Sequence, residues 1–161
     1  MTIRKVCVDD AAAITAIYNR YVTETTTSFE TEPVTVEAMR RRIAELSSQF
    51  PYYVAVIDDT VVGYCYAHLW KERAAYRDTL ETTIYLYPNA KHQGIGTRLM
   101  HHLIDDCHQR GCKVLIACIT AENHESRAFH ARLGFKQVSL FEGVGCKFGR
   151  RLDVADYQLQ L

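Results

Sequence analysis

The chain has 161 residues, of which 48% are apolar and 24% are charged, and its 19 Lys and Arg residues are balanced by 19 Asp and Glu residues. This length and composition favour one folded domain, residues 1–161, with a substantial core. The zero net charge argues against a dedicated nucleic-acid binder, which usually carries a basic excess. No apolar run approaches the length of a membrane span.

The cysteines and the N-terminus indicate a reducing compartment. The six cysteines form no Cys-x-x-Cys pair and no closely spaced zinc pattern with His, so we predict reduced thiols and no metal site. Cys65 and Cys118 lie in apolar, strand-like runs, where Cys usually acts as a small hydrophobic residue. Because the first ten residues lack the apolar core of a secretory signal, we expect a cytoplasmic protein.

The first third of the chain predicts a strand, a helix and a loop. Residues 2–8 alternate loosely as a strand, and Asp9 or Asp10 can cap the helix that follows. Apolar residues recur in this helix at helical spacing: Ala13, Ile14, Ile17, Tyr18 and Tyr21. The β-branched, polar stretch 25–33 ends in proline and predicts a loop.

A second helix and a hairpin follow. Thr35 can cap the helix, which carries an apolar face. That face comprises Met39, Ile43 and Leu46. Residues 52–70 are two apolar runs around Asp58–Asp59–Thr60, which predicts a β-hairpin with Gly63 as a candidate bulge.

The rest of the chain alternates between predicted strands and helices. Residues 71–78 form a polar, basic connection, and residues 79–87 alternate between apolar and polar side chains as a strand. The next helix ends at Gly111, and the continuous apolar run 113–120 predicts a strand buried on both faces.

Asn123 can cap a further helix that closes at Gly134. Residues 135–141 and 154–161 predict strands, and the glycine-rich, basic stretch 143–151 between them predicts a mobile loop. The order β-α-α-β-β-β-α-β-α-β-β predicts an α/β (α+β) fold, in which about seven strands of a mixed sheet are flanked by about four helices.

The stretch Pro88–Ile104 places Gly94 and Gly96 at the start of a helix, which is a common anion site because the first turn has unpaired N–H groups. A Walker loop requires Lys after its last glycine, but Thr97 and Arg98 follow here. A dinucleotide loop requires a third glycine and follows the first strand, so it fails too. The pyrophosphate of coenzyme A and a plain strand-to-helix turn remain open.

The neighbouring stretches resemble the GNAT superfamily of N-acetyltransferases. Lys91, Gly94 and Gly96 match its acyl-CoA motif, (Arg/Gln)-x-x-Gly-x-(Gly/Ala). Residues 81–88 are similar to its fourth strand, and residues 123–135 to its Asn-x-x-(Ser/Ala)…Leu-Gly-Phe motif. The resemblance covers nearly the whole chain and implies the GNAT acyl-CoA N-acyltransferase fold.

Four segments resemble the phosphinothricin and methionine-sulfoximine N-acetyltransferases in particular: residues 16–22, 27–35, 61–88 and 143–161. Two positions depart from the superfamily pattern. Lys91 stands where Arg or Gln is usual, but only its backbone amide is expected at the phosphates. His92 replaces a residue that is often Gly, which alters loop packing without removing the anion site.

The resemblance implies that acetyl-CoA is the acetyl donor. It assigns cofactor contacts to the fourth strand, to the glycine loop and to the start of the later helix. These residues are Tyr85, Leu86, Tyr87, Gln93, Gly94, Ile95, Gly96, Thr97, Arg98, Asn123 and Ser126. Helix capping alone would also explain Asn123.

Two residues are candidate catalysts. Glu81 lies on the polar face of its strand, and by resemblance it deprotonates the amine directly or through water. A surface ion pair with an Arg is the alternative. His130 stands where many superfamily members have a proton-donating tyrosine, and a histidine satisfied by a backbone group is equally compatible with the sequence.

We expect the amine to be selected by residues 25–33 and 70–78. Phe29 and Trp70 could wall the pocket of a small amino acid, and the cations Lys71, Arg73 and Arg77 could meet its carboxylate. A solvated basic loop is the alternative for each cation.

The leading hypothesis is an acetyl-CoA-dependent N-acetyltransferase for the α-amino group of a small amino acid or analogue. Alternatives are a GNAT enzyme for another amine (protein N-terminus, polyamine or aminoglycoside) and a non-catalytic acyl-CoA sensor. The basic pocket loops count against a polycation. By resemblance we also expect a homodimer, and no nucleic-acid or membrane partner.

Overall fold

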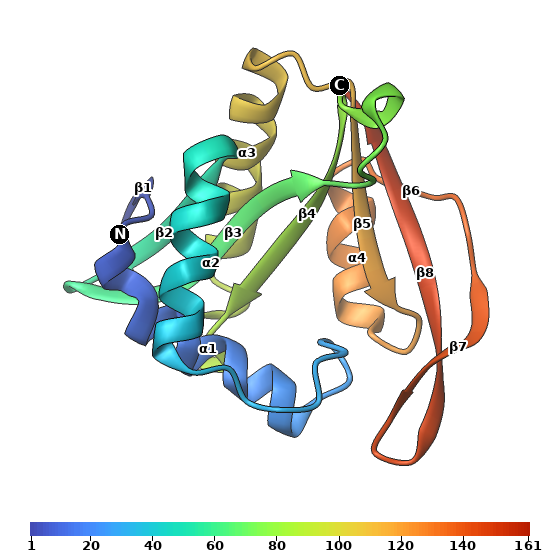
Figure 1. The fold of residues 1–161 in the computed structure, drawn as a ribbon, viewed down its shortest axis with the longest axis horizontal. Helices are drawn as coiled ribbons and strands as arrows, with labels where there is room; N and C mark the ends of the chain where they lie inside the picture. The colour runs from blue at the N-terminus through green and yellow to red at the C-terminus, as the bar shows by residue number, and fades with distance from the viewer. The chain divides into compact units, whose positions relative to one another are not determined.

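A computed structural model describes all of residues 1–161. Eight strands form one mixed sheet in the hydrogen-bonded order β1-β2-β3-β4-β5-β8-β6, with β7 paired to β8 (Figure 1). Four helices accompany them, so the predicted α/β fold is confirmed. The chain divides into two compact units of three segments each, residues 1–20, 34–68 and 83–111 in the first and residues 21–33, 69–82 and 112–161 in the second.

The first unit contains β1, α2, β2 and α3, most of α1 and β3, and the end of β4. Their bounds are β1 Thr2–Lys5, α1 Ala11–Glu24, α2 Val36–Gln49, β2 Tyr52–Ile57, β3 Thr60–Leu69, β4 Thr79–Leu86 and α3 Ile95–Gln109. Helix α3 packs on β2 through its apolar face, and the Tyr53 hydroxyl of β2 donates a hydrogen bond of 2.7 Å to Asp106 of α3. The predicted end of α3 at Gly111, which has a φ of 87°, is confirmed.

The hairpin of β2 and β3 turns where the sequence predicts it. Asp58 and Asp59 have φ values of 47° and 59°, as a tight two-residue turn between antiparallel strands requires. The register shifts where Ala55 pairs with Gly63 but Val56 pairs with Val61, so the bulge lies beside Gly63. A β-carbon at Gly63 would lie 2.6 Å from Leu86 Cδ2, so glycine at this position leaves room for the Leu86 side chain of β4.

Helix capping agrees with the sequence at α2 and differs at α1. The Thr35 hydroxyl accepts from the Ala38 N–H at 3.1 Å, as predicted. At α1, a 3-10 turn over Val8–Asp10 runs directly into the helix, so neither aspartate caps it. Asp10 instead accepts the Cys7 N–H at 2.9 Å and both arms of the Arg4 guanidinium at 2.8 Å.

The second unit is arranged around β5. Its elements are β5 Val114–Thr120, α4 His124–Arg132, β6 Lys136–Gln137, β7 Phe141–Lys147 and β8 Arg150–Gln160. Strand β5 runs parallel to β4 over Thr79–Glu81 and antiparallel to β8 along its whole length. Its apolar residues are buried as predicted, but Cys118 is exposed, so its expected place in the core is wrong.

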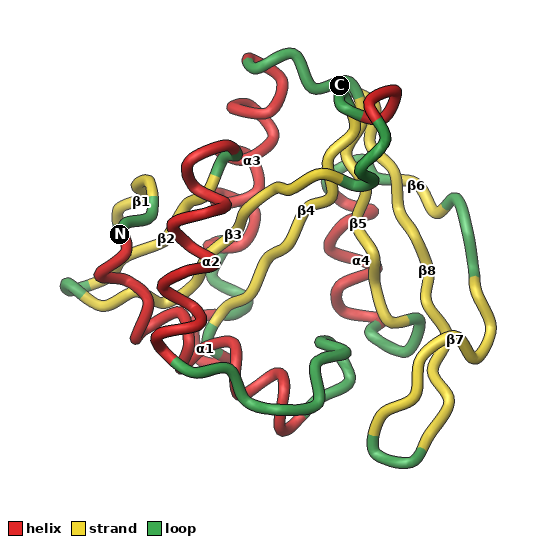
Figure 2. Tube along the Cα trace, viewed as in Figure 1, coloured by secondary structure: helices red, strands yellow, loops and turns green.

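The predicted mobile loop at residues 143–151 is also wrong, because this stretch contains most of β7, a two-residue turn and the start of β8. Strand β7 and β8 are drawn as strands in Figure 2, joined by a two-residue turn at Phe148 and Gly149, with φ values of 52° and 71°. The glycines that suggest a loop are part of the hairpin. The predicted strand at 135–141 is confined to the short β6 and the first residue of β7.

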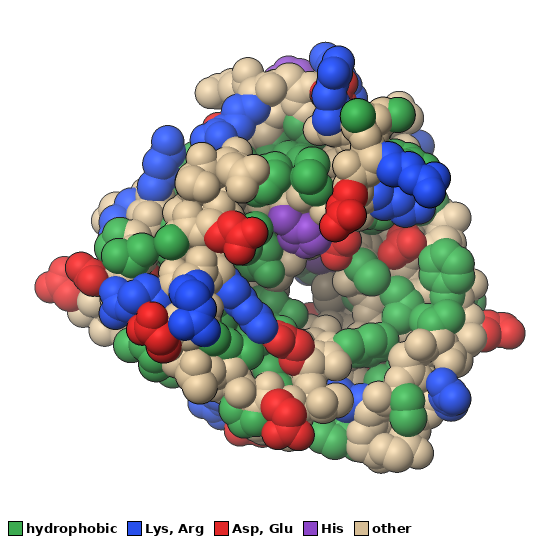
Figure 3. All heavy atoms as spheres, in the orientation of Figure 1, with side chains coloured by type: hydrophobic (Ala, Val, Ile, Leu, Met, Phe, Trp, Pro, Cys, Tyr) green, Lys and Arg blue, Asp and Glu red, His purple; other side chains and the backbone are tan.

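Charged side chains are mixed on the molecular surface. On the face drawn in Figure 3, Lys and Arg side chains are interspersed with Asp and Glu, and no extended basic stripe crosses it. None of the helices combines the length and the apolar character needed to cross a bilayer.

Candidate active site

The glycine loop of the first unit opens directly onto the N-terminus of α3. Gly94 stands at the N-cap position with a φ of 75°, in the left-handed region that glycine adopts most easily. No side chain caps the helix, so the N–H groups of its first turn have no acceptor within the helix. Together with the positive end of the helix dipole, they form a site for an anion.

Burial divides the predicted cofactor residues of this loop into two groups. Ile95 and Gly96 are buried and anchor the helix, whereas Gln93, Gly94, Thr97 and Arg98 are exposed. The Gln93 side-chain amide donates to the Asn89 carbonyl at 2.7 Å and braces the loop from within. The exposed residues are therefore those that can meet a bound phosphate.

Of three predicted cofactor residues, Tyr85 and Leu86 end β4, and Tyr87 follows the strand. The ring of Tyr85 packs edge-on against Tyr18, with centroids 5.3 Å apart, and also contacts Tyr64 at 5.7 Å. The Tyr87 N–H donates to the Val62 carbonyl at 2.9 Å. All three side chains are half-buried, and the ring of Tyr85 has a packing role.

Glu81, the candidate base, belongs to the second unit. It is half-buried at the last residue of the parallel pairing between β4 and β5, opposite Ile116. Cys118, two residues further along β5, points to the same side of the sheet. Desolvation of the thiolate raises the pKa of Cys118 to about 12, and the negative charges of Glu81 and Asp156 contribute.

His130, the candidate acid, is a buried residue of α4 with 3% of its surface exposed. Its Nδ1 lies 2.8 Å from the Ser126 carbonyl and 3.3 Å from the Ser126 hydroxyl. Its ring meets those of Phe129 and Phe135 edge-on. Burial lowers the pKa of His130, although the hydrogen bond to Ser126 opposes this shift. A neutral imidazole held in this way is a poor proton donor, and its catalytic role stays a prediction.

Asn123 caps α4 as predicted, because its side-chain oxygen accepts the Ser126 N–H at 3.1 Å. Its amide nitrogen donates to the Thr27 hydroxyl at 3.4 Å. The residue therefore links α4 to the loop at residues 25–33, and its contact with pantetheine stays a prediction.

The predicted substrate residues of segment 69–82 make contacts with one another and with their neighbours. The Lys71 ammonium lies 4.3 Å from the centre of the Trp70 ring, which packs edge-on against Tyr76. Arg77 pairs with Asp78 at 3.7 Å, and both side chains are exposed. Arg73 is exposed and begins the 3-10 turn Ala74–Tyr76. Exposed pairs of this kind are weak, so these cations can exchange their partners for a carboxylate.

Phe29 lies on the backbone of β7. A β-carbon at Gly145 would overlap the Phe29 ring, so the ring occupies the place of a side chain at that position. Phe29 remains 40% exposed and can therefore also meet a ligand.

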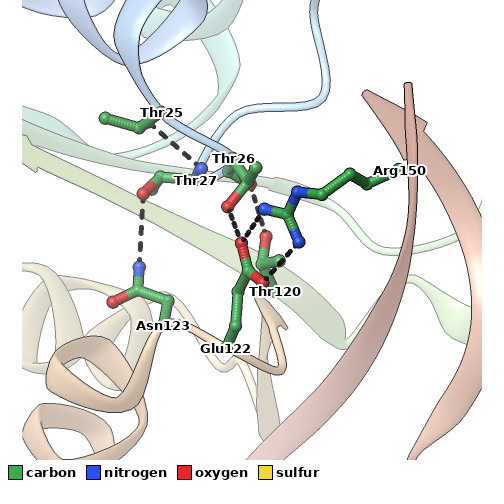
Figure 4. Close-up of polar contacts among 7 residues, drawn as sticks. All are labelled: Thr25, Thr26, Thr27, Thr120, Glu122, Asn123 and Arg150. Atoms are coloured by element: carbon green, nitrogen blue, oxygen red, sulfur yellow. Dashed lines mark hydrogen bonds and ion pairs between the residues drawn. The ribbon is translucent and has the colours of Figure 1, made fainter. Parts of the chain in front are cut away.

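The loop at residues 25–33 is tied to distant parts of the second unit by side chains that the sequence analysis missed (Figure 4). The Thr26 hydroxyl donates to Glu122 at 2.6 Å, and Arg150 pairs with the same carboxylate at 2.9 Å. The Thr120 hydroxyl donates to the Thr26 carbonyl at 2.7 Å. The hydrogen bonds from Arg150 and Thr26 lower the pKa of Glu122.

Lys147 of β7 is a further residue that the sequence analysis did not assign to the site. It is buried, and its ammonium donates to the Ser28 carbonyl at 2.6 Å and to the Tyr21 carbonyl at 3.5 Å. Burial lowers the pKa of Lys147. It is the last residue of β7, two residues after the buried Gly145, and the glycines around it favoured a loop in the sequence.

The chain belongs to the acetyltransferase (GNAT) family, whose profile matches residues 14–135. The chain is 41% identical to the phosphinothricin N-acetyltransferase of Alcaligenes faecalis, across 99% of this chain and 82% of that protein. It is 34% identical to the L-methionine sulfoximine/L-methionine sulfone acetyltransferase of Salmonella typhimurium, across 100% of this chain and 95% of that protein.

A solved structure shares the fold. The phosphinothricin acetyltransferase of Sinorhizobium meliloti, in complex with acetyl-CoA, matches with a TM-score of 0.96 and 35% identity, across 99% of this chain and 88% of that one. The predicted family and subfamily resemblance is thereby confirmed, and the protein is an acetyltransferase.

Proposed function

We propose that the protein transfers the acetyl group of acetyl-CoA to the α-amino group of a small amino acid or analogue, of the phosphinothricin or methionine-sulfoximine type. The observation that carries this proposal is the uncapped N-terminus of α3 behind Gly94, which suits the pyrophosphate of coenzyme A. The names of the two curated relatives support the acceptor class.

The chemistry requires few groups. Glu81 accepts a proton from the substrate ammonium, directly or through water, and the neutral amine attacks the thioester carbonyl. A C–N bond forms, the C–S bond breaks and the thiolate of coenzyme A departs, while the remaining extra proton of the nitrogen passes to the thiolate or to water. Backbone N–H groups can stabilise the negative charge that develops on the carbonyl oxygen. His130 was predicted to protonate the thiolate, but a thiolate is a good leaving group and the step can proceed without it.

The cofactor is held by backbone and small side chains. The first-turn N–H groups of α3 and the exposed Thr97 and Arg98 meet the pyrophosphate. Tyr85 and Leu86 of β4 and the following Tyr87 are the proposed pantetheine contacts of the first unit. Asn123 and Ser126 are the proposed cofactor contacts of the second unit. The remaining loop residues, Gln93, Ile95 and Gly96, set the shape of the anion site.

The acceptor is held by the basic segment and by Phe29. A small amino acid presents a carboxylate, which Arg73 or Arg77 can bind with two parallel hydrogen bonds. Lys71 and Trp70 form a cation–π pair that can border the pocket. This surface disfavours a polyamine or an aminoglycoside, because both are polycations.

We further propose that the two units act as one domain, because β4 contributes to both and the family profile spans segments of both. A homodimer is supported by exposed apolar residues on β7 and its flanks in the second unit. These are Val138, Leu140, Phe141, Val144 and Phe148. A cytoplasmic location is supported by six free cysteines, since oxidising compartments favour disulfides.

The proposed function is tested by measuring release of the coenzyme A thiol from acetyl-CoA with a panel of amines. Phosphinothricin, methionine sulfoximine and methionine sulfone are expected to be turned over, and spermidine, an aminoglycoside and an N-terminal peptide are not. Faster release with the peptide would favour a protein substrate. Tight binding of acetyl-CoA with no turnover of any amine would indicate a sensor.

The role of Glu81 is tested with Glu81→Gln. Removing a general base is expected to lower kcat at neutral pH by about 10²-fold or more. The loss should shrink at alkaline pH, where solvent deprotonates the amine. Equal kcat values for the variant and the wild type across the pH range would show that Glu81 is not the base.

A further inference from the structure

Lys147 is an unusual residue for its position. It is the last residue of β7, and only 4% of its surface is exposed, whereas buried strand positions normally carry an apolar side chain. Burying an ammonium group is costly unless it is hydrogen-bonded. Here the ammonium donates to the carbonyls of Ser28 and Tyr21, at 2.6 Å and 3.5 Å, so two backbone groups replace its water.

The two carbonyls belong to the end of α1 and to the loop that follows. Tyr21 is in the last turn of α1, where a cation is favourable, and its carbonyl also accepts the Thr25 hydroxyl at 2.8 Å. Ser28 lies in the middle of the loop at residues 25–33, and its hydroxyl accepts the Glu30 N–H at 3.2 Å. Lys147 therefore fixes the backbone on the N-terminal side of Phe29, and the Ser28 hydroxyl fixes it on the C-terminal side.

Phe29 is seated by the same strand. Gly145, two residues before Lys147, presents the same side of β7 and leaves room for the Phe29 ring. The position of this ring thus depends on two neighbouring features of β7, an ammonium that holds the backbone and a glycine that admits the side chain.

The first half of the loop is held differently. Thr26 and Arg150 share the Glu122 carboxylate, and the side chains of this ion pair are 55% and 42% exposed (Figure 4). Exposed pairs contribute little and are screened by salt. The buried Lys147 contact is firmer than this ion pair, because few water molecules compete for its hydrogen bonds. The hydroxyl of the buried Thr120, which donates to the Thr26 carbonyl at 2.7 Å, holds the first half of the loop as well.

We propose that Lys147 is a positioning residue that determines acceptor selectivity: by fixing the Ser28 carbonyl, it sets where Phe29 lies in the amino-acid pocket. This inference rests on the proposed function, in which Phe29 borders the acceptor. It assigns Lys147 no contact with substrate or with acetyl-CoA.

The test is Lys147→Met, which keeps the aliphatic stem and removes the ammonium. Lys136→Met, at an exposed lysine of β6, is the matched control. Steady-state kinetics with phosphinothricin and hydrogen exchange of residues 25–33 are measured for both variants and for the wild type. We expect Lys147→Met to raise the KM for phosphinothricin about tenfold, because a small displacement of a positioning group is costly.

The same variant should leave the KM for acetyl-CoA within about twofold of the wild type, because the cofactor loop makes no use of Lys147. It should also speed hydrogen exchange in residues 25–33. The Lys136→Met variant should match the wild type in all three measurements. A merely structural role for Lys147 would lower stability and leave both KM values unchanged, and this result would overturn the inference.

A second variant covers the case in which Lys147→Met does not fold. Lys147→Arg keeps the charge but places a larger, planar head against the Ser28 carbonyl, so the loop must shift. Its relative kcat/KM for phosphinothricin and methionine sulfone should differ from the wild-type ratio, and an unchanged ratio would overturn the inference. If the wild type acetylates no amino acid, the proposed function fails, and the inference fails with it.

Discussion

The glycine loop at Lys91–Gly96 and the loop at residues 25–33 are built in contrasting ways. The glycine loop is held from within, by the left-handed backbone of Gly94 and by the bond from Gln93 to Asn89, four residues away. The loop at 25–33 is held from outside, by Glu122, Thr120 and Lys147, which lie between 94 and 119 residues from their partners in the chain. A cofactor site common to a family can be local, whereas an acceptor loop can be adjusted through distant residues.

The comparison predicts that changes in the glycine loop affect acetyl-CoA alone. Gly94→Asp is expected to weaken coenzyme A binding by about 30-fold or more, since a non-glycine residue in the left-handed region costs about 1–2 kcal/mol and the carboxylate repels the phosphates. Gly94→Asn is the matched control, because it has the same shape without the charge and tolerates this backbone. Titration calorimetry measures both. An affinity of Gly94→Asp equal to that of the wild type would remove the pyrophosphate from this site.

Substitutions on β7 that disturb the position of the Phe29 ring should affect binding of the acceptor alone. In Gly145→Ala the new β-carbon displaces the Phe29 ring, so the KM for phosphinothricin is expected to rise about threefold to tenfold, since a misplaced group near the substrate is costly. A double-mutant cycle with Phe29→Ala decides whether Gly145 acts through the ring. Strictly additive effects of the two substitutions on KM would show that it does not.

The smallest expected effect concerns His130 of α4, the helix whose capping residue Asn123 contacts Thr27 of the loop. Because burial lowers the pKa of His130, the unfolded chain binds a proton below about pH 6.5 that the folded chain does not. Stability should therefore fall as the pH drops below this value, by at most about 1.4 kcal/mol per pH unit. His130→Gln removes this dependence, as urea unfolding between pH 5 and 8 would show.

The exposed His124 of the same helix provides the control, His124→Gln, whose stability profile should follow that of the wild type. Kinetics of His130→Gln separate the two hypotheses for this residue. A kcat near the wild-type value would support the structural role, and a loss that appears only where His130 is protonated in the wild type would support the proton donor.

Local sequence signals predicted much of the fold. Thr35 and Asn123 cap their helices, and Gly111 ends α3, because each acts on a backbone group within a few residues. The family motif in the glycine loop is local for the same reason. The Asp58–Asp59 turn was also recognisable, since two adjacent apolar runs leave only those residues to reverse the chain.

The remaining features depend on contacts that the sequence does not display. The glycines of residues 143–151 suggested a loop, although Gly145 is a strand residue that makes room for Phe29. The contacts of Lys147 could not be read from the sequence, because its acceptors are backbone carbonyls, which every residue has. The sequence favours Asp10 as a helix cap, but its carboxylate instead accepts hydrogen bonds from the Arg4 guanidinium and the Cys7 N–H.

The order of the segments along the chain has a consequence for redesigning the enzyme. Residues 21–33 are an insertion between two segments of the first unit, whereas β7 and Lys147 lie in the last segment of the second unit. If the loop alone were grafted from a relative, the residues that replace Ser28 and Phe29 would contact a β7–β8 hairpin that does not match them. A chimera that exchanges residues 21–33 together with residues 141–151 keeps the two matched, and it is the smallest exchange expected to carry a substrate preference from one enzyme to another.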